Sequence, residues 1–481
     1  MFIGLDIGTS SVKAVLLDDD QHPVASASAP LDVSRPHPGW SEQDPDSWWT
    51  GVEATLDDLS HRFPREMAAV RGIGLSGHMH GATLLDATDR PLRPCILWND
   101  GRSASQCTEL EAREPRFLTL GGNRVMPGFT APKLQWVREN EPDIFTKVAK
   151  VLLPKDYVRL RLTGDHVGDM SDSAGTLWLD VAARDWSEPL LAATGLSRAH
   201  MPRLVEGSDA SGRLRPELAA RWGMTQAPVV AGGGGDNAAS ACGVGAVKPG
   251  SAFVSLGTSG VLFVTNDRFS PNVGSAVHAF CHAVPDTWHQ MGVILSATDS
   301  LNWLSKILRR PAAELTAMVT DINGPSAVQF MPYLGGERTP HNDVAVRGGF
   351  QGLAHETGET DLTHAVLDGV TFALMDCLGA LTAAGSSVTR VTAVGGGSRS
   401  RTWLEIIATV LGVTVDVPQD GDFGAALGAA RLGQAAADGY DPSTFFAPPL
   451  AASIDPNPNL RSAYADAYRH WRNLYPAMKE I

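Results

Sequence analysis

Two short turns in the sequence combine the residue types that bind phosphate groups. Gly8-Thr9-Ser10 separates two apolar segments near the start of the chain, and Gly257-Thr258-Ser259 separates two more in its second half. A tight hairpin turn presents backbone N–H groups and small hydroxyls to one side, which makes a concave site for an anion. Two such turns facing each other across a cleft would hold a polyphosphate from both sides.

An acidic side chain stands beside the first of these turns. Asp6 lies where the first apolar segment meets the turn. A carboxylate next to phosphates repels them unless a cation intervenes, so we interpret Asp6 as a partner of Mg²⁺, acting through water. The structural alternative is that Asp6 only accepts hydrogen bonds from its own turn.

The segments around the turns predict an α/β chain. Residues 2–17 and 251–264 each have the pattern of strand, tight turn and strand, which favours two similar halves. A match this short also arises by chance, because hairpins reuse the same residues. Strand-like and helix-like patterns alternate elsewhere, and Asp44-Pro45 has the residue types of a helix start.

The chain is too long for one ordinary hydrophobic core. Its 481 residues predict two or three domains. We place the boundary just before the second hairpin, which gives an N-terminal domain over residues 1–246 and a C-terminal domain over residues 247–481. Near the end, aromatic residues recur at helical spacing and predict a helix packed on the second domain: Tyr464, Tyr468, Trp471 and Tyr475.

The composition excludes several classes of partner. Hydrophobic residues make up 43% of the chain and charged residues 19%, as in globular proteins. A net charge of −14 without a basic run is a poor match for nucleic acid or an anionic membrane. We find no apolar run of the roughly 18 residues that span a bilayer, no signal peptide and no CxxC spacing. We therefore expect a cytoplasmic protein that binds neither nucleic acid nor membrane.

Common nucleotide-binding motifs are missing or incomplete. The sequence has no GxxxxGK[ST] phosphate loop and no protein-kinase motif set. Residues 72–77 fit GxGxxG, but His78-Met79-His80 follows in place of a helical pattern, so a dinucleotide site is not expected. Two histidines separated by one residue are also too few for a metal site.

Five segments resemble motifs of a protein superfamily and of one enzyme family within it. Residues 6–10, 256–260 and 394–397 are similar to the first phosphate, second phosphate and adenosine motifs of the actin-like ATPase superfamily. Residues 128–137 and 349–353 are similar to the two signatures of the FGGY family of carbohydrate kinases. The resemblance implies two actin-like (ribonuclease H-like) α/β domains, each a mixed sheet flanked by helices, with a cleft between them.

Further segments resemble the members of the family that phosphorylate xylulose. They are residues 35–45, 76–82, 97–102, 153–157 and 335–341. The resemblance implies ATP-dependent phosphorylation of D-xylulose to D-xylulose 5-phosphate with Mg²⁺. Two alternatives remain: a kinase for another ketose or polyol (ribulose, gluconate or glycerol), and a non-catalytic actin-like ATP-binding protein.

The resemblance also assigns the catalytic base. Asp236 follows the glycines at 232–235 and matches the aspartate that accepts the proton of the sugar hydroxyl in the family. The alternative is that Asp236 caps a helix beginning near Ala238. This chain has four glycines where the family pattern has three. Asp6 and Asp236 are thus the expected catalytic residues and the expected Mg²⁺ ligands.

The remaining assignments concern the substrates and the hinge. Asp100 is expected either to bind a sugar hydroxyl or to brace its loop. Residues 421–430 resemble a connecting helix at the domain hinge. We also consider a homodimer. The sugar is expected to contact Met79, His80, Trp98, Asp100, Asp236 and Asn237, and ATP is expected to contact Thr9, Ser10, Gly257, Thr258, Ser259, Gly396 and Gly397.

Overall fold

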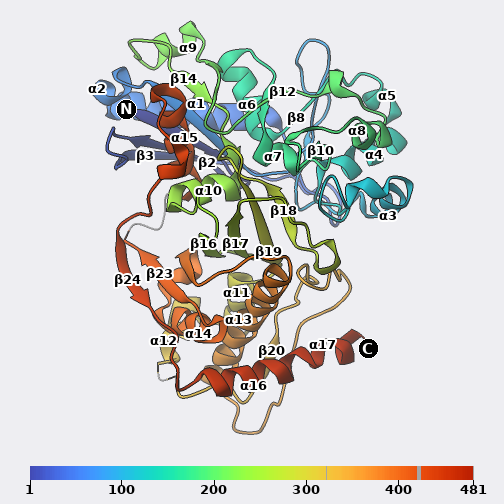
Figure 1. Ribbon diagram of the computed structural model, residues 1–481, viewed down its shortest axis with the longest axis vertical. Coiled ribbons are helices and arrows are strands. Elements are labelled where there is room, and N and C mark those ends of the chain that lie inside the picture. The colour runs from blue at the N-terminus through green and yellow to red at the C-terminus, as the bar shows by residue number, and fades with distance from the viewer. Residues whose placement is uncertain (321, 420–423, 480–481) are drawn as a thin grey trace.

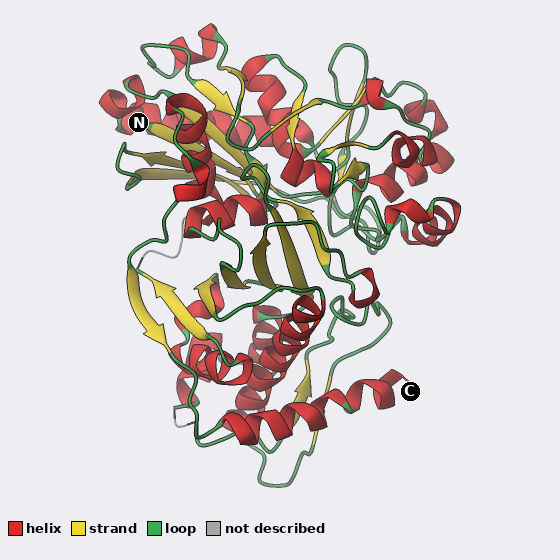
Figure 2. Cartoon of the chain, in the orientation of Figure 1, coloured by secondary structure: helices red, strands yellow, loops and turns green. Residues whose placement is uncertain are grey.

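Two sheets of seven strands, each flanked by helices, make up the computed structural model, which describes residues 1–320, 322–419 and 424–479. Figure 1 shows the first sheet in the blue-to-green part of the chain and the second in the yellow-to-red part, and Figure 2 shows the helices around both. This mixed α/β organisation is the one that the sequence predicts.

The central strands have the same order in the two sheets. In the first sheet β1 pairs with the antiparallel strand β2 and with the parallel strand β5; in the second, β16 pairs in the same way with β17 and β22. The shared orders are β14-β5-β1-β2-β3 and β23-β22-β16-β17-β19. Their bounds are β1 (Phe2–Ile7), β2 (Ser11–Leu17), β3 (Pro23–Pro30), β5 (Gly72–Gly77), β14 (Val229–Ala231), β16 (Ala252–Leu256), β17 (Gly260–Asn266), β19 (Trp288–Ile294), β22 (Arg390–Val394) and β23 (Thr414–Pro418).

The other strands extend these sheets or form small pairs. β13 (Ala210–Arg213) and β15 (Gly234–Gly235) belong to the first sheet, and β18 (His278–Cys281) and β24 (Leu450–Ile454) to the second. The pairs are β4 (Glu42–Gln43) with β7 (Cys95–Ile96), β6 (Thr83–Leu85) with β8 (Lys150–Leu152), β9 (Val167–Asp169) with β12 (Arg203–Val205), β10 (Leu179–Asp180) with β11 (Asp185–Trp186), and β20 (Gln329–Met331) with β21 (Gly349–Gln351).

The helices follow the patterns of the sequence. α1 begins as expected, because the Asp44 side chain accepts a hydrogen bond from the Asp46 N–H at 3.0 Å and Pro45 occupies the first turn. The α-helices are α1 (Pro45–Arg62), α2 (Pro64–Ala68), α3 (Ala104–Arg113), α4 (Thr130–Asn140), α5 (Pro142–Phe145), α6 (Pro154–Thr163), α7 (Met170–Ala174), α8 (Glu188–Ala193), α9 (Pro216–Arg221), α10 (Asp236–Val244), α11 (Thr298–Leu308), α12 (Ala312–Met318), α13 (Glu359–Ala383), α14 (Arg401–Leu411), α15 (Gly424–Asp438), α16 (Arg461–Arg472) and α17 (Leu474–Lys479).

α15 comes from the second half of the chain but packs on the first sheet (Figure 1). A Cβ atom on Gly4 of β1 or Gly74 of β5 would lie 1.8 or 1.7 Å from a backbone carbonyl oxygen of α15. One on Gly428 of α15 would lie 1.7 Å from a carbonyl oxygen of α10. Small residues therefore allow close packing of this helix, which includes the described part of the expected connecting helix at residues 421–430; residues 421–423 lie outside the described residues.

The proposed domain boundary falls between the sheets along the chain. β15 ends at Gly235 and β16 begins at Ala252, so residue 246 lies in the connection between them. Because α15 returns to the first sheet, the two sheets do not divide the chain into two separate continuous segments. A boundary between residues 246 and 247 stays a prediction.

One helix is long and apolar on average, but Asp368 and Asp376 interrupt it, so it does not contradict the expectation that no continuous apolar run is long enough to span a bilayer. Among the described residues, α13 is the one helix with the length and the mean hydropathy, 1.5, of a membrane-spanning helix. However, 83% of its most apolar 18-residue window is buried inside the protein. It packs against β19 and β20, as expected of a core helix. α16 covers it through Tyr464 and Trp471, each 1% exposed, which confirms a packed aromatic helix, although Tyr475 lies in the next helix, α17.

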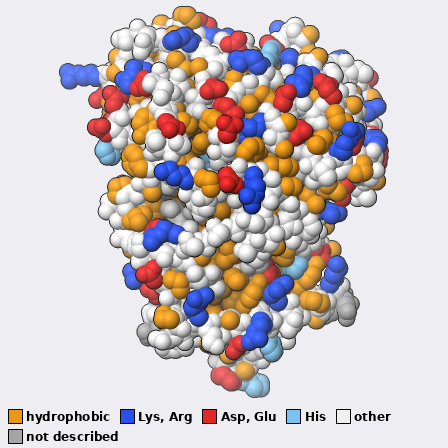
Figure 3. Space-filling view, viewed as in Figure 1, with side chains coloured by type: hydrophobic (Ala, Val, Ile, Leu, Met, Phe, Trp, Pro, Cys, Tyr) orange, Lys and Arg blue, Asp and Glu red, His pale blue; other side chains and the backbone are white. Residues whose placement is uncertain are grey.

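The surface carries charges of both signs. Figure 3 shows Lys and Arg side chains interspersed with Asp and Glu over the face in view, without a continuous basic patch. All five cysteines are buried and free. Neither observation departs from the expectations drawn from the composition.

Candidate active site

Parallel pairing brings Asp6 and Asp236 to one end of the first sheet. β1 and β15 both run parallel to β5, and Asp6 and Gly234 are level with the same residue, Ser76. Asp236 follows β15 directly and is the first residue of α10, so this helix begins two residues earlier than expected. The capping position belongs to Gly235, which removes the alternative role of Asp236 as a helix cap.

The environment of Asp236 suits a general base. Burial, and then the negative charge of Asp6, raise the pKa of Asp236 to about 6. Its Oδ1 atom accepts hydrogen bonds from the backbone N–H and the side-chain Nδ2 of Asn237, at 2.7 and 2.9 Å. Within the described part of the chain Oδ2 accepts none, so it can take a proton from a substrate.

The two carboxylates fit a metal ion that arrives with a nucleotide. Ser76 Oγ donates to Asp6 Oδ1 at 3.0 Å, and burial raises the pKa of Asp6. The described residues contain no group of three or more His, Cys, Asp or Glu side chains able to hold a metal alone. Mg²⁺ commonly takes one or two carboxylates together with substrate phosphates and water. Asp6 and Asp236 are that kind of donor set.

The glycines before Asp236 are required by close backbone packing. A Cβ atom on Gly232 or Gly233 would lie 2.1 Å from a carbonyl oxygen, of Glu206 and Leu75 respectively, and Gly233 has φ +73°. One on Gly235 would lie 2.9 Å from a Met79 side-chain atom. The fourth glycine is therefore accommodated in a densely packed run, and Asp236 still begins the helix.

Met79 lies beside this run, and His80 follows it in the loop after β5. His80 Nδ1 lies 2.6 Å from the carbonyl oxygen of Gly175, at the end of α7. Burial lowers the pKa of His80 to about 3, so the ring is neutral; Nδ1 donates to that carbonyl and Nε2 is an acceptor. The ring also meets Phe129 edge-on at 4.8 Å. Met79 is 5% exposed.

A lysine fixes the backbone of His80, a role that the sequence analysis missed. His80 has the left-handed φ of +71°, which is unfavourable for a side chain with a Cβ. Lys133 Nζ donates to the carbonyl oxygens of His80 and Gly128 at 2.8 and 2.7 Å, and Thr130 Oγ1 donates to His80 at 3.1 Å. Burial lowers the pKa of Lys133 to about 7. The sequence did contain a signal for this role, because Lys133 lies within residues 128–137, which resemble the first family signature.

Trp98 and Asp100 differ in how accessible their side chains are to a substrate. Trp98 is 38% exposed, and its Nε1 donates to Thr9 Oγ1 at 3.0 Å, which links this loop to the first phosphate turn. Asp100 is 2% exposed and accepts hydrogen bonds from Arg102 Nε and Nη2 and from the Ser41 N–H, at 2.9, 2.7 and 2.6 Å. These contacts occupy both carboxylate oxygens and favour the bracing alternative for Asp100.

The two predicted phosphate turns are both present. Gly8, Thr9 and Ser10 connect β1 to β2, and the second turn connects β16 to β17. In the second, the carbonyl oxygen of Gly257 accepts from Thr298 N and Oγ1 at 2.9 and 2.7 Å. Thr258 and Ser259 complete this turn, which is thereby fixed to the start of α11.

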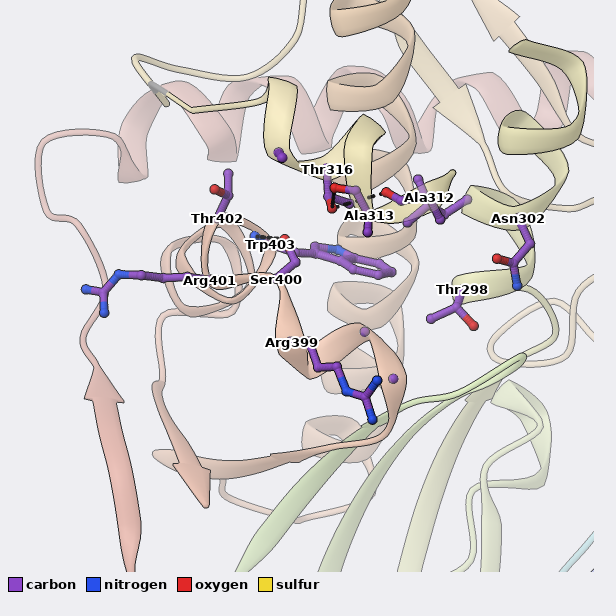
Figure 4. A pocket seen from close by; sticks show the side chains of 14 residues that line it. Thr298, Asn302, Ala312, Ala313, Thr316, Arg399, Ser400, Arg401, Thr402 and Trp403 are labelled. Carbon is purple, nitrogen blue, oxygen red and sulfur yellow. Dashed lines mark hydrogen bonds between the residues drawn. The ribbon is translucent and has the colours of Figure 1, made fainter. Parts of the chain in front are cut away.

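A cavity of about 600 Å³ opens beyond the second turn (Figure 4). A Cβ atom on Gly396 would have no neighbour within 4 Å, whereas one on Gly397 would lie 2.7 Å from Leu256 and 2.9 Å from Trp403. Gly396 therefore faces open space, and Gly397 is a packing position. The lining residues are Thr298, Leu301, Asn302, Ala312, Ala313, Thr316, Ala317, Gly396, Gly397, Arg399, Ser400, Arg401, Thr402 and Trp403.

Comparison with known families identifies the class of protein. Residues 1–243 match the N-terminal domain, and residues 252–437 the C-terminal domain, of the FGGY family of carbohydrate kinases. The chain belongs to this family. The expected fold of two actin-like domains is thereby confirmed, together with the family's use of ATP.

Individual relatives are similar over their full length. The xylulose kinase of Escherichia coli K12 is 49% identical over 479 residues, covering 99% of this chain and 98% of that protein. The xylulose kinase of Klebsiella pneumoniae is 47% identical, with both chains fully covered. The solved structure of a xyloylose (xylulose) kinase from Brucella ovis superposes with a TM-score of 0.98 at 58% identity, covering 100% of this chain and 99% of that one.

Proposed function

We propose that the chain transfers the γ-phosphoryl group of ATP to D-xylulose, giving ADP and D-xylulose 5-phosphate. The observation that carries this proposal is the full-length likeness to xylulose kinases, at 49% identity to the Escherichia coli enzyme. The position of Asp236 near Asp6, directly after Gly235, which packs against Met79, supports it, because it supplies a base near a side chain suited to a sugar.

Asp236 acts as the general base in this proposal. With a pKa of about 6 it is mostly ionised at neutral pH, and Oδ2 accepts the proton of the sugar hydroxyl. The hydroxyl oxygen forms a bond to the γ-phosphorus while the bond from that phosphorus to the bridging oxygen of ADP breaks. Asp6 and Asp236, together with ATP oxygens, would hold Mg²⁺, which would neutralise phosphate charge.

The sugar is oriented by the side chains next to Asp236. His80 Nε2 accepts a hydrogen bond from a hydroxyl, and Met79 offers the apolar contact. Asn237 keeps Asp236 Oδ1 occupied, which directs Oδ2 to the substrate. Contacts of the sugar with Trp98 and Asp100 stay predictions.

ATP is held by the two turns and the cavity beyond them. Backbone N–H groups and hydroxyls of Thr9, Ser10, Thr258 and Ser259 face the phosphates. Gly396 leaves space for the nucleoside, and Gly397 allows the close packing that shapes the cavity. A requirement for ATP supports a cytoplasmic location, and a homodimer is a further proposal that light scattering tests against the 51.0 kDa chain.

A coupled assay of ADP release with a panel of sugars tests the substrate. We expect the fastest turnover with D-xylulose and little ADP without a sugar. Faster turnover with ribulose, gluconate or glycerol would show that the chain is a kinase for another ketose or polyol. ADP release that no sugar stimulates would instead favour an actin-like ATP-binding protein.

A further inference from the structure

Five charged side chains are buried together behind the glycines that precede Asp236. Lys155, Asp156 and Arg159 come from α6, Asp169 from the end of β9, and Asp172 from α7; each is at most 1% exposed. Lys155 Nζ lies 2.6, 2.7 and 3.2 Å from carboxylate oxygens of the three aspartates. Buried ion pairs of this kind contribute little net stability, but they fix the groups that make them.

One end of the glycine run is held by Arg159. Its Nη1 atom donates to the carbonyl oxygen of Ala231 at 3.0 Å, and Nη2 donates to that of Gly232. Nη2 also lies 3.3 Å from Asp156 Oδ1, so the guanidinium is anchored within the cluster. The planar fork of an arginine can bridge two carbonyl oxygens, which a lysine ammonium does less well.

The other end is held through Ser171. The Ser171 hydroxyl donates to Asp169 Oδ2 at 2.5 Å, and the backbone N–H of Ser171 donates to the same oxygen at 2.7 Å. With its proton directed at Asp169, Ser171 Oγ accepts a hydrogen bond from the N–H of Gly235 at 3.2 Å. Gly235 is the residue before Asp236, so this contact reaches the backbone that carries the proposed base.

We propose that the buried cluster positions Asp236, with Arg159 and Ser171 holding the two ends of the glycine run. Glycine restricts its own φ and ψ little, so the path of four glycines in succession depends on contacts that other parts of the structure make with them. A displacement of roughly 1 Å at a reacting group can cost on the order of 10²-fold in rate. This inference rests on the proposed role of Asp236 as the base.

α7 connects this cluster to the other side of the sugar site. Its start is capped by Asp169, and the carbonyl oxygen of Gly175 at its end receives the hydrogen bond from His80. α7 therefore contacts the backbone next to the proposed base, through Ser171. The residue after its end, Gly175, contacts the imidazole ring of His80, which is proposed to bind the sugar. The cluster accordingly fixes the base relative to the sugar.

The test compares two serines of α7. Ser171→Ala removes the acceptor for Gly235, and Ser173→Ala is its control, because Ser173 is equally buried on the same helix and its Oγ has no hydrogen-bond partner among the described residues. We expect Ser171→Ala to lower kcat by on the order of 10-fold, with the KM for ATP and the Tm close to those of Ser173→Ala.

A double variant separates positioning from general destabilisation. If Ser171 acts through Asp236, Ser171→Ala has no further effect on turnover in an Asp236→Ala background. A multiplicative loss in the double variant, or equal kcat values for Ser171→Ala and Ser173→Ala, would overturn the inference and leave the role of Asp236 intact. Near-normal turnover of Asp236→Ala alone would instead overturn the proposed function.

Arg159→Lys provides the same test at the other end of the run if Ser171→Ala does not fold. It keeps the buried charge but removes the bridge between Ala231 and Gly232. We expect lower kcat with an unchanged KM for ATP, and again no additional loss with Asp236→Ala. An unchanged kcat in Arg159→Lys, or a further loss of turnover when it is combined with Asp236→Ala, would contradict the proposal that Arg159 positions Asp236.

Discussion

The two halves of the molecule share a strand order but differ in chemistry. Asp6 stands two residues before Gly8 in the first hairpin, and Ser255 holds the equivalent position in the second. The first sheet has acquired two carboxylates at the ends of its strands, whereas the second hairpin is fixed to α11 and leads to a cavity of about 600 Å³. The same strand order thus carries the proposed reacting groups in one half and a cavity in the other.

The difference shows what each substrate requires. On the proposed sugar side, Asp236, His80 and Lys133 each make hydrogen bonds of 2.6 to 2.9 Å to neighbouring protein groups, and a reacting hydroxyl needs partners that are held in place in this way. The nucleoside takes no part in bond making, and Gly396, its proposed neighbour, faces open space. Substitutions in the first group should therefore change the rate, and those in the second should change ATP binding.

The largest effect is expected at the base. Asp236→Ala should lower kcat by on the order of 10²–10⁴-fold, because the sugar hydroxyl loses its proton acceptor. The affinity for ATP, measured by calorimetry, should stay near that of the unaltered protein. Turnover close to normal would remove Asp236 from the mechanism and end the contrast between the two halves.

A smaller effect is expected on the nucleotide side. Gly396→Trp should raise the KM for ATP by on the order of 10-fold, since a side chain there fills the cavity, with the KM for xylulose unchanged. Gly379→Trp is the control, because Gly379 is exposed and a Cβ there also has no neighbour within 4 Å. Unaltered ATP affinity would count against the assignment of the cavity.

The pH dependence tests the pairing of the two carboxylates. Asp236 must be ionised to accept a proton, so kcat/KM should fall as the pH drops through about 6. The charge of Asp6 contributes to that raised pKa, so Asp6→Asn should move the acid limb to lower pH and weaken the dependence on Mg²⁺. Ser255→Ala should leave the acidic side of the pH profile of kcat/KM unchanged. A shift in this variant would contradict the proposed difference between the Asp6 and Ser255 positions.

The smallest effect is expected at the half-exposed tryptophan. Trp98→Phe removes one hydrogen bond to Thr9 Oγ1, worth about 0.5–1.5 kcal/mol, and keeps an aromatic side chain at this position. KM values should rise a few-fold at most, with kcat nearly unchanged. A loss as large as that of Asp236→Ala would show that Trp98 orients a reacting group.

Local patterns predicted the elements well, because their causes are local. Apolar residues flanking Gly-Thr-Ser marked both hairpins, and Asp44-Pro45 marked the start of α1. The packing of α15 on Gly4 and Gly74 could not be predicted, since it depends on contacts between residues more than 300 positions apart. The start of α10 was placed two residues late.

Within the site, side chains suited to substrates were easier to find than those that support them. Asp6, Asp236 and His80 stand next to glycines or turns, where function is common. Arg159 escaped notice, because charged residues are rarely fully buried, and Lys155 was given no role although it lies within the resembling segment 153–157. The roles proposed for these residues await the experiments above.

The contact of α15 with the first sheet has a consequence for biosynthesis. The last residue of that helix, Asp438, leaves the ribosome long after β1 has been made. Until then the glycine-lined side of β1 and β5, together with the apolar cluster of Phe2 and Leu17, lacks its cover. A sheet that is translated well before α15 is therefore completed only after it, and a nascent chain halted before α15 should be sensitive to protease.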